Sequence, residues 1–201
     1  MVNYHSEKLK SGLYLVATPL GSARDITLRA LDVLSSCDAI AAEDTRSMRK
    51  LLNIHNIPIN DRPLLSYNDF NGDQVRPKIF DWLDRNMAVA YASDAGMPLI
   101  ADPGYQLSKQ AADRGFYVTS VPGASACITA LTLSGLPTDR FFFEGFLPVT
   151  KEKRRHKLKE LSNIHSTLIF YESPKRLIKM FDDLVAIMGE NRRAVIAREL
   201  T

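Results

Sequence analysis

Short apolar runs alternate with helical segments along almost the whole chain, and this alternation limits the fold more than any other feature. The runs interpreted as strands cover residues 13–18, 38–43, 63–67, 87–92, 116–121, 141–146, 167–171 and 194–197. The segments interpreted as helices cover residues 26–35, 45–52, 72–85, 105–114, 127–134, 151–161 and 177–188. A strand–helix alternation of this kind predicts an α/β fold with largely parallel sheets.

The chain has a natural break in its second half. Gly135-Leu136-Pro137 ends a helix and precedes the apolar run 141–146. A chain of 201 residues with 45% hydrophobic and 24% charged residues is long enough for one large or two small globular domains. We expect the seam between Val121 and Phe141, with an N-terminal α/β domain at 1–122 and a C-terminal α/β domain at 123–201.

Several classes of protein are not indicated by the sequence. Residues 1–12 are polar, so we expect no signal peptide, and no run is long and apolar enough for a membrane span. Cys37 and Cys127 match no zinc or redox spacing, and the four histidines are scattered. These features predict a cytoplasmic protein with no metal and no membrane partner. The net charge of +3 only weakly suggests an anionic partner.

A loop at 93–104 follows the apolar run 87–92 and contains two glycines, two prolines and two aspartates. Gly96 permits backbone conformations that other residues resist, and Pro98 and Pro103 stiffen the chain. The carboxyl ends of strands are where open α/β sheets bind ligands. The pattern favours a binding loop, with an ordinary strand-to-helix turn as the alternative.

Other strand ends carry polar or small residues. Glu43, Asp44 and Arg46 lie together where a strand meets a helix. They either face a substrate or have a structural role, with Asp44 capping the helix and Glu43 pairing with Arg46. Asp25 is predicted to cap the helix at 26–35. Residues 122–126 are small at a helix start, which suits either ligand approach or tight packing.

The segment 151–161 is a basic helix. It carries six lysines and arginines but only two acids, Glu152 and Glu160. Such a run is either a solvated face or a contact surface for nucleic-acid phosphates.

The loops together form an ordered set of motifs. They are Thr18-Pro-Leu-Gly21, Ala42-Glu-Asp-Thr-Arg46, Ser93-Asp-Ala-Gly-x-Pro98, Asp102-Pro-Gly104, Val121-Pro-Gly-Ala124, Glu144-Gly-Phe146, Phe170-Tyr-Glu-Ser173 and Ala197-Arg-Glu-Leu-Thr201. This set closely resembles the ribosomal RNA small subunit methyltransferase I branch of the tetrapyrrole methylase superfamily. The resemblance covers nearly the whole chain.

The resemblance implies two tetrapyrrole-methylase-like α/β domains with S-adenosylmethionine in the cleft between them. It also implies a homodimer that methylates the ribose 2′-oxygen of a cytidine in 16S rRNA of the small ribosomal subunit. The family pattern continues beyond Thr201, so we expect a C-terminally truncated chain with an incomplete second domain. The strand expected at 194–197 would then present an unpaired edge.

The expected site residues fall into three groups. A ribose hydroxyl needs a nearby base and the phosphates need cations, so the candidate catalytic residues are Glu43, Asp44, Arg46 and Glu199. The expected cofactor contacts are Pro19, Leu20, Gly21, Asp94, Ala95, Gly96, Pro98, Ser125, Ala126, Tyr171 and Ala197. The expected RNA contacts are Lys153, Arg154, Arg155, Lys175, Arg176 and Arg198.

Two other functions stay open. A methylase acting on a tetrapyrrole (precorrin-type) carbon is one, although that branch usually has a glycine-rich first loop, unlike residues 19–22. A non-catalytic cofactor- or RNA-binding remnant is the other.

Overall fold

The structure, a computed structural model, describes residues 3–201. Residue contacts group the chain into two compact units, Met1–Ala126 with Thr201, and Cys127–Leu200. A parallel sheet forms the centre of each unit, as the strand–helix alternation predicts.

The first unit is built on five parallel strands in the order β3-β2-β4-β1-β5. The strands are β1 (Gly12–Val16), β2 (Ala39–Ala42), β3 (Leu64–Ser66), β4 (Ala88–Ala92) and β5 (Val118–Val121). The helices are a 3-10 turn η1 (Ala23–Asp25), α1 (Leu28–Ser36), α2 (Thr45–Ile54), α3 (Gly72–Asp84) and α4 (Tyr105–Asp113). Because all five strands are parallel, their carboxyl ends lie at one edge of the sheet.

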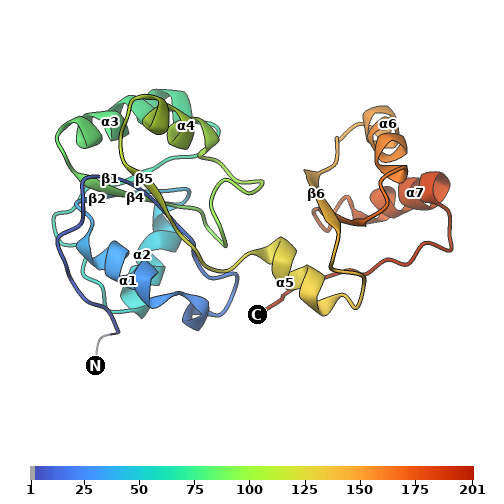
Figure 1. The fold of residues 1–201 in the computed structure, drawn as a ribbon, viewed down its shortest axis with the longest axis horizontal. Helices are drawn as coiled ribbons and strands as arrows, with labels where there is room; N and C mark the ends of the chain where they lie inside the picture. Colours follow the sequence, from blue (N-terminus) through green and yellow to red (C-terminus); the bar gives the residue numbers. More distant parts are fainter. Residues whose placement is uncertain (1–2) are drawn as a thin grey trace. The chain divides into compact units, whose positions relative to one another are not determined.

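Helices cover both faces of this sheet (Figure 1). On one face, α1 and α2 pack against side chains such as Val16 and Ile40. On the other, α3 and α4 pack against side chains such as Leu13 and Val89. Every residue of β4 is buried, which explains why this central strand is a continuous apolar run. Trp82 belongs to the second cluster and is a core residue.

The second unit contains a βαβ element. Its strands β6 (Phe141–Phe146) and β7 (Thr167–Tyr171) are parallel, with an irregularity between Phe143 and Gly145. Its helices are α5 (Ala126–Leu133), α6 (Lys151–Ser162) and α7 (Leu177–Met188). Leu158 and Leu161 of α6 and Met180 of α7 form its core with Leu147.

Two local predictions are wrong. Asp25 ends the η1 turn, and the N-cap of α1 is Thr27, whose hydroxyl accepts the Ala30 N–H at 3.1 Å. The spacing explains this, because a capping side chain reaches the N–H two or three positions into its own helix. The strand expected at 194–197 is absent, since residues 189–201 form neither helix nor strand. An apolar run becomes a strand only where a neighbouring strand pairs with it.

Among residues 3–201, none of the helices has both the length and the apolar character needed to cross a membrane.

Candidate functional site

The loops after β1 and β4 are joined at the carboxyl edge of the first sheet. Thr18 and Gly96 exchange two backbone hydrogen bonds of 3.0 Å, and the Thr18 hydroxyl donates to the Ser93 carbonyl at 3.1 Å. Gly96 has a φ of +83°, and a Cβ there would lie 3.2 Å from Leu20 Cδ2 and 3.5 Å from the Ala124 carbonyl. Three predicted cofactor segments therefore meet around one glycine.

The loops after β2 and β4 are also joined, through carboxylates. The Asp94 N–H donates to Glu43 Oε2 at 3.2 Å, and the Asp44 N–H donates to Asp94 Oδ1 at 3.2 Å. The structure thus brings together Glu43, Asp44 and Asp94, which the sequence placed 50 residues apart. Among the other predicted cofactor contacts in these loops, Pro19 and Pro98 are buried, whereas Gly21 and Ala95 are exposed.

Asp44 has the structural role that the sequence left open. Its carboxylate caps α2 by accepting the Arg46 N–H at 2.8 Å, and it also binds the Arg46 guanidinium at 2.7 Å. The predicted alternative of a Glu43–Arg46 pair is therefore wrong, because Arg46 pairs with Asp44. The side-chain hydrogen bond from Arg46 lowers the pKa of Asp44 to about 2. Such an acid stays ionised and is a weak base.

Asp102 is a carboxylate that the site prediction missed. Burial, followed by the negative charges of Glu43, Asp94 and Asp69, raises its pKa from the ordinary 3.8 to about 6, although a hydrogen bond from Ser93 opposes the shift. A general base works best with a pKa near the working pH. The available signal was its place in the stiff 93–104 loop, but the shift comes from burial and from charges that include Glu43 and Asp69 on two other segments.

The 93–104 loop holds an unusual backbone. Leu99 and Ala101 have φ values of 73° and 58°, a region that residues other than glycine seldom occupy. The Tyr91 hydroxyl fixes the loop by donating to the Pro103 carbonyl at 2.8 Å. Gly104, at φ +114°, leaves room for the Tyr91 ring, because a Cβ there would lie 2.4 Å from Tyr91 Cε1. Backbone strain of this kind is often found at ligand sites.

The predicted residues at the end of β7 and directly after it lie in the second unit. Tyr171 packs edge to face against Phe143 and Phe146, with ring centroids 5.0 and 5.7 Å away. Arg176 donates to the Leu147 carbonyl at 2.8 Å and pairs with Glu172 at 3.2 Å, while Lys175 is exposed. Arg176 therefore links the ends of β6 and β7.

The last predicted residues follow α7. Ala197, Arg198 and Glu199 are exposed, and Arg198 Nε lies 3.7 Å from Glu199 Oε1. At the end of the chain, Thr201 belongs to the first unit, and its hydroxyl accepts the Ser22 N–H at 3.0 Å.

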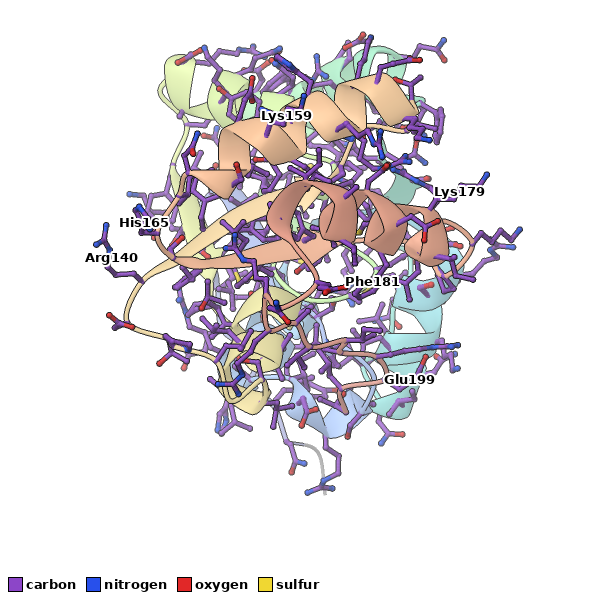
Figure 2. The ribbon with its side chains drawn as sticks, turned by 90° about the vertical axis from the view of Figure 1, so that its right-hand side faces the viewer. Arg140, Lys159, His165, Lys179, Phe181 and Glu199 are labelled. Carbon is purple, nitrogen blue, oxygen red and sulfur yellow. The ribbon has the colours of Figure 1, made fainter. Side chains whose placement is uncertain are left out.

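The basic helix α6 differs from its prediction. Arg154 is only 5% exposed, and its guanidinium binds the buried Asp183 of α7 at 2.7 Å and the Val149 carbonyl at 2.9 Å. Arg155 also binds Asp183, at 2.7 Å. Arg154 is thus a poor phosphate contact, because its guanidinium N–H groups already bind acceptors inside the unit. Lys151, Lys153 and Lys159 are exposed instead, and Figure 2 shows Lys159 on α6 and Lys179 on α7.

The charge of the chain is unevenly distributed. Residues 127–200 contain 13 lysines and arginines and nine acids, whereas the rest of the chain contains 13 and 14. The excess of positive charge therefore belongs to the second unit. Within residues 3–201, no group of three or more His, Cys, Asp or Glu side chains is placed to hold a metal ion.

The sequence pattern of the tetrapyrrole (corrin/porphyrin) methylases matches residues 12–201. The chain belongs to this family. Methylases of the family use S-adenosylmethionine, so the expected cofactor class is confirmed at the level of the family.

Curated relatives show which branch of the family this chain is most similar to among the proteins compared below. The chain is 47% identical over 199 residues to "Ribosomal RNA small subunit methyltransferase I" of Halalkalibacterium halodurans, covering 99% of this chain and 68% of the relative. It is 48% identical over 189 residues to the protein of that name from Escherichia coli O157:H7, covering 94% of this chain and 65% of the relative. The chain thus spans about two thirds of the length of these relatives. The predicted resemblance is confirmed.

Solved structures confirm the fold class of this family member. A cobalt precorrin-4 methyltransferase matches with a TM-score of 0.67 and 15% identity, covering 89% of this chain and 75% of the other. A uroporphyrin III C-methyl transferase from Thermus thermophilus matches with a TM-score of 0.62 and 16% identity, covering 89% and 77%. The chain therefore has an α/β fold of the tetrapyrrole methylase type.

Proposed function

We propose that this chain transfers a methyl group from S-adenosylmethionine to the ribose 2′-oxygen of a cytidine in 16S rRNA of the small ribosomal subunit. The observation that carries the proposal is the 47% identity to a curated small-subunit rRNA methyltransferase along 99% of the chain. Because the proposed substrate is part of the ribosome, the proposed location of the protein is the cytoplasm. The tetrapyrrole methylases of known structure are only 15–16% identical, and this similarity supports the fold alone.

The loops around Gly96 suit a ligand that approaches the backbone closely. A Cβ at Gly96 would lie 3.2 Å from Leu20 Cδ2 and 3.5 Å from the Ala124 carbonyl, so glycine keeps this point between the loops free of a side chain. We assign S-adenosylmethionine to this position, where its sulfonium would supply the methyl group. Contacts from Tyr171 and Ala197, and a cofactor cleft between the domains, stay predictions.

Replacing Gly96 by valine is expected to abolish cofactor binding, because the side chain fills the space beside Leu20. Gly115→Val is the matched control: Gly115 has a similar φ of +79°, but a Cβ there meets nothing within 4 Å. Calorimetric titration with S-adenosylmethionine should detect binding by the control and none by Gly96→Val. Equal affinities would contradict the assignment.

The chemistry requires a base, because the ribose hydroxyl must lose its proton as the new O–C bond forms and the S–C bond breaks. Asp102 is the carboxylate best suited to accept this proton, since its pKa is raised to about 6. Glu43 contributes part of that shift and orients the Asp94 N–H. Asp44 and Arg46 form a mutual ion pair that supports the start of α2. A role for Glu199 stays a prediction.

The proposed RNA-docking surface consists of the exposed lysines of α6, namely Lys151, Lys153 and Lys159. Changing all three to alanine should weaken RNA binding and make its salt dependence shallower by roughly 0.7 per lost contact. Changing Lys8, Lys50 and Lys78, exposed lysines of the first unit, is the control with the same loss of charge. An unaltered slope after the α6 changes would mean that this helix face is merely solvated.

The remaining predicted RNA contacts are Arg155, Lys175, Arg176 and Arg198. Arg155 and Arg176 already hold protein partners, so exposed Lys175 and Arg198 are the better candidates. The homodimer also stays a prediction, and sedimentation over a range of concentrations tests it.

A further inference from the structure

The aromatic side chain of Phe70 is exposed to solvent and is not packed into the fold. It lies in the turn between β3 and α3, and its side chain is 99% exposed. A single exposed apolar side chain is not remarkable by itself. What distinguishes Phe70 is the built structure of the turn beneath it.

Two asparagines fix the conformation of this turn. Asn68 Oδ1 accepts the N–H groups of Phe70 and Asn71 at 3.0 and 3.3 Å. Asn71 Oδ1 in return accepts the Asn68 N–H at 2.8 Å, and Asn71 Nδ2 donates to the Ser66 carbonyl at 3.0 Å. The backbone that carries Phe70 is therefore ordered before any partner arrives, which lowers the entropy cost of binding.

The same turn is tied to the candidate site. The Tyr67 N–H donates to the Ala42 carbonyl at 2.8 Å, and the Ser66 hydroxyl donates to the Glu43 carbonyl at 2.9 Å. The Glu43 side chain in turn holds the Asp94 N–H. A continuous set of hydrogen bonds thus sets the place of Phe70 relative to Glu43, at the carboxyl edge of the first sheet.

We propose that Phe70 stacks on an unpaired nucleobase of the RNA substrate. This inference rests on the function proposed above. Proteins that recognise RNA bases splay them out of the helix and stack them on aromatic side chains. Any base offers a flat face, so one rigid, exposed ring at the site edge is sufficient for such a contact.

The surroundings of Phe70 favour a base over a protein partner or a phosphate. Its sequence neighbours Asn68, Asp69 and Asn71 are polar, whereas the centre of a protein interface is predominantly apolar. The exposed carboxylate of Asp69 disfavours a phosphate at this position. The base is the uncharged, flat part of a nucleotide, and it is therefore the part that suits this turn.

The test compares Phe70→Ala, Phe70→Leu and Phe70→Trp in the full chain. The probe is a short single-stranded RNA that carries one fluorescent cytosine analogue, whose emission is quenched by stacking. Phe70→Ala should weaken binding about 5- to 150-fold and remove the quenching, Phe70→Leu should resemble it, and Phe70→Trp should restore both. The thermal midpoint and the affinity for S-adenosylmethionine should not change, because the ring is exposed.

Unaltered RNA affinity in Phe70→Ala would overturn the inference. Unaltered RNA affinity in Phe70→Leu would overturn it as well, since an apolar contact would then be sufficient. A change from dimer to monomer on sedimentation, with RNA binding intact, would assign the ring to a second copy of the chain instead. Failure of the proposed function would be detected separately, if the chain without substitutions did not methylate small-subunit RNA.

Discussion

Asp183→Ala is expected to destabilise the second unit by about 3–5 kcal/mol, the usual cost of breaking a buried ion pair on one side. Asp183 is 1% exposed and receives both Arg154 and Arg155 of α6 at 2.7 Å. Removing the carboxylate leaves the Arg154 guanidinium buried without its counter-charge. Because Asp183 belongs to α7, the contact between the two helices that cover the β6–β7 pair weakens as well.

Asp182→Ala is the matched control, since Asp182 is the preceding residue of the same helix but is exposed. Hydrogen exchange should show rapid loss of amide protection in α6 and α7 for Asp183→Ala only. Burial raises the pKa of Asp183, but the hydrogen bonds and charges of Arg155 and Arg154 together outweigh it and hold this pKa below the ordinary 3.8. This stabilisation is therefore present above about pH 4 and is lost as the pH falls through the lowered pKa. Equal protection in the two variants would show that the ion pairs contribute little.

Asp102→Asn is expected to stabilise the protein and to abolish most of its methyl transfer. The pKa of Asp102 is about 6 in the folded chain, against an ordinary 3.8. The folded state thus binds the proton more tightly than the unfolded state, so the contribution of Asp102 to stability falls as the pH rises from about 4 to about 6. Above that range the carboxylate is a cost of folding, and asparagine removes it.

The activity of the same variant should change in the opposite direction. Loss of a general base typically costs about 10²–10⁴-fold in rate. The wild-type rate should rise with pH through about 6, the pKa of Asp102, and the variant should be slow without that step. Asp61→Asn, a change at an exposed turn residue, is the control for stability and rate. A variant with a normal rate and an unchanged pH profile would exclude Asp102 as the base.

Much of the fold follows from local pattern. The predicted bounds of β6 at 141–146 and of α7 at 177–188 match the structure to the residue. The strand–helix alternation predicted parallel strands, and the loops that follow parallel strands share one edge of the sheet. The strand expected at 194–197 failed because pairing is a long-range event that the run itself does not encode.

Site residues could be predicted where their position directly after a strand was sufficient. They could not be predicted where their properties depend on residues far away in the sequence. Glu43, Asp44 and Asp94 lie at strand ends, and topology brings these ends together. The pKa of Asp102 depends on burial and on charges in the loops after β2, β3 and β4. The burial of Arg154 depends on Asp183 of another helix, so a run of basic residues could not reveal it.

The most direct test of the proposed function incubates this chain with small ribosomal subunits and S-adenosylmethionine labelled in its methyl group, followed by digestion of the 16S rRNA to nucleosides. We expect label in 2′-O-methylcytidine, and strongly reduced label with Asp102→Asn. Cofactor binding without label in RNA, or label on a base rather than on the ribose oxygen, would contradict it.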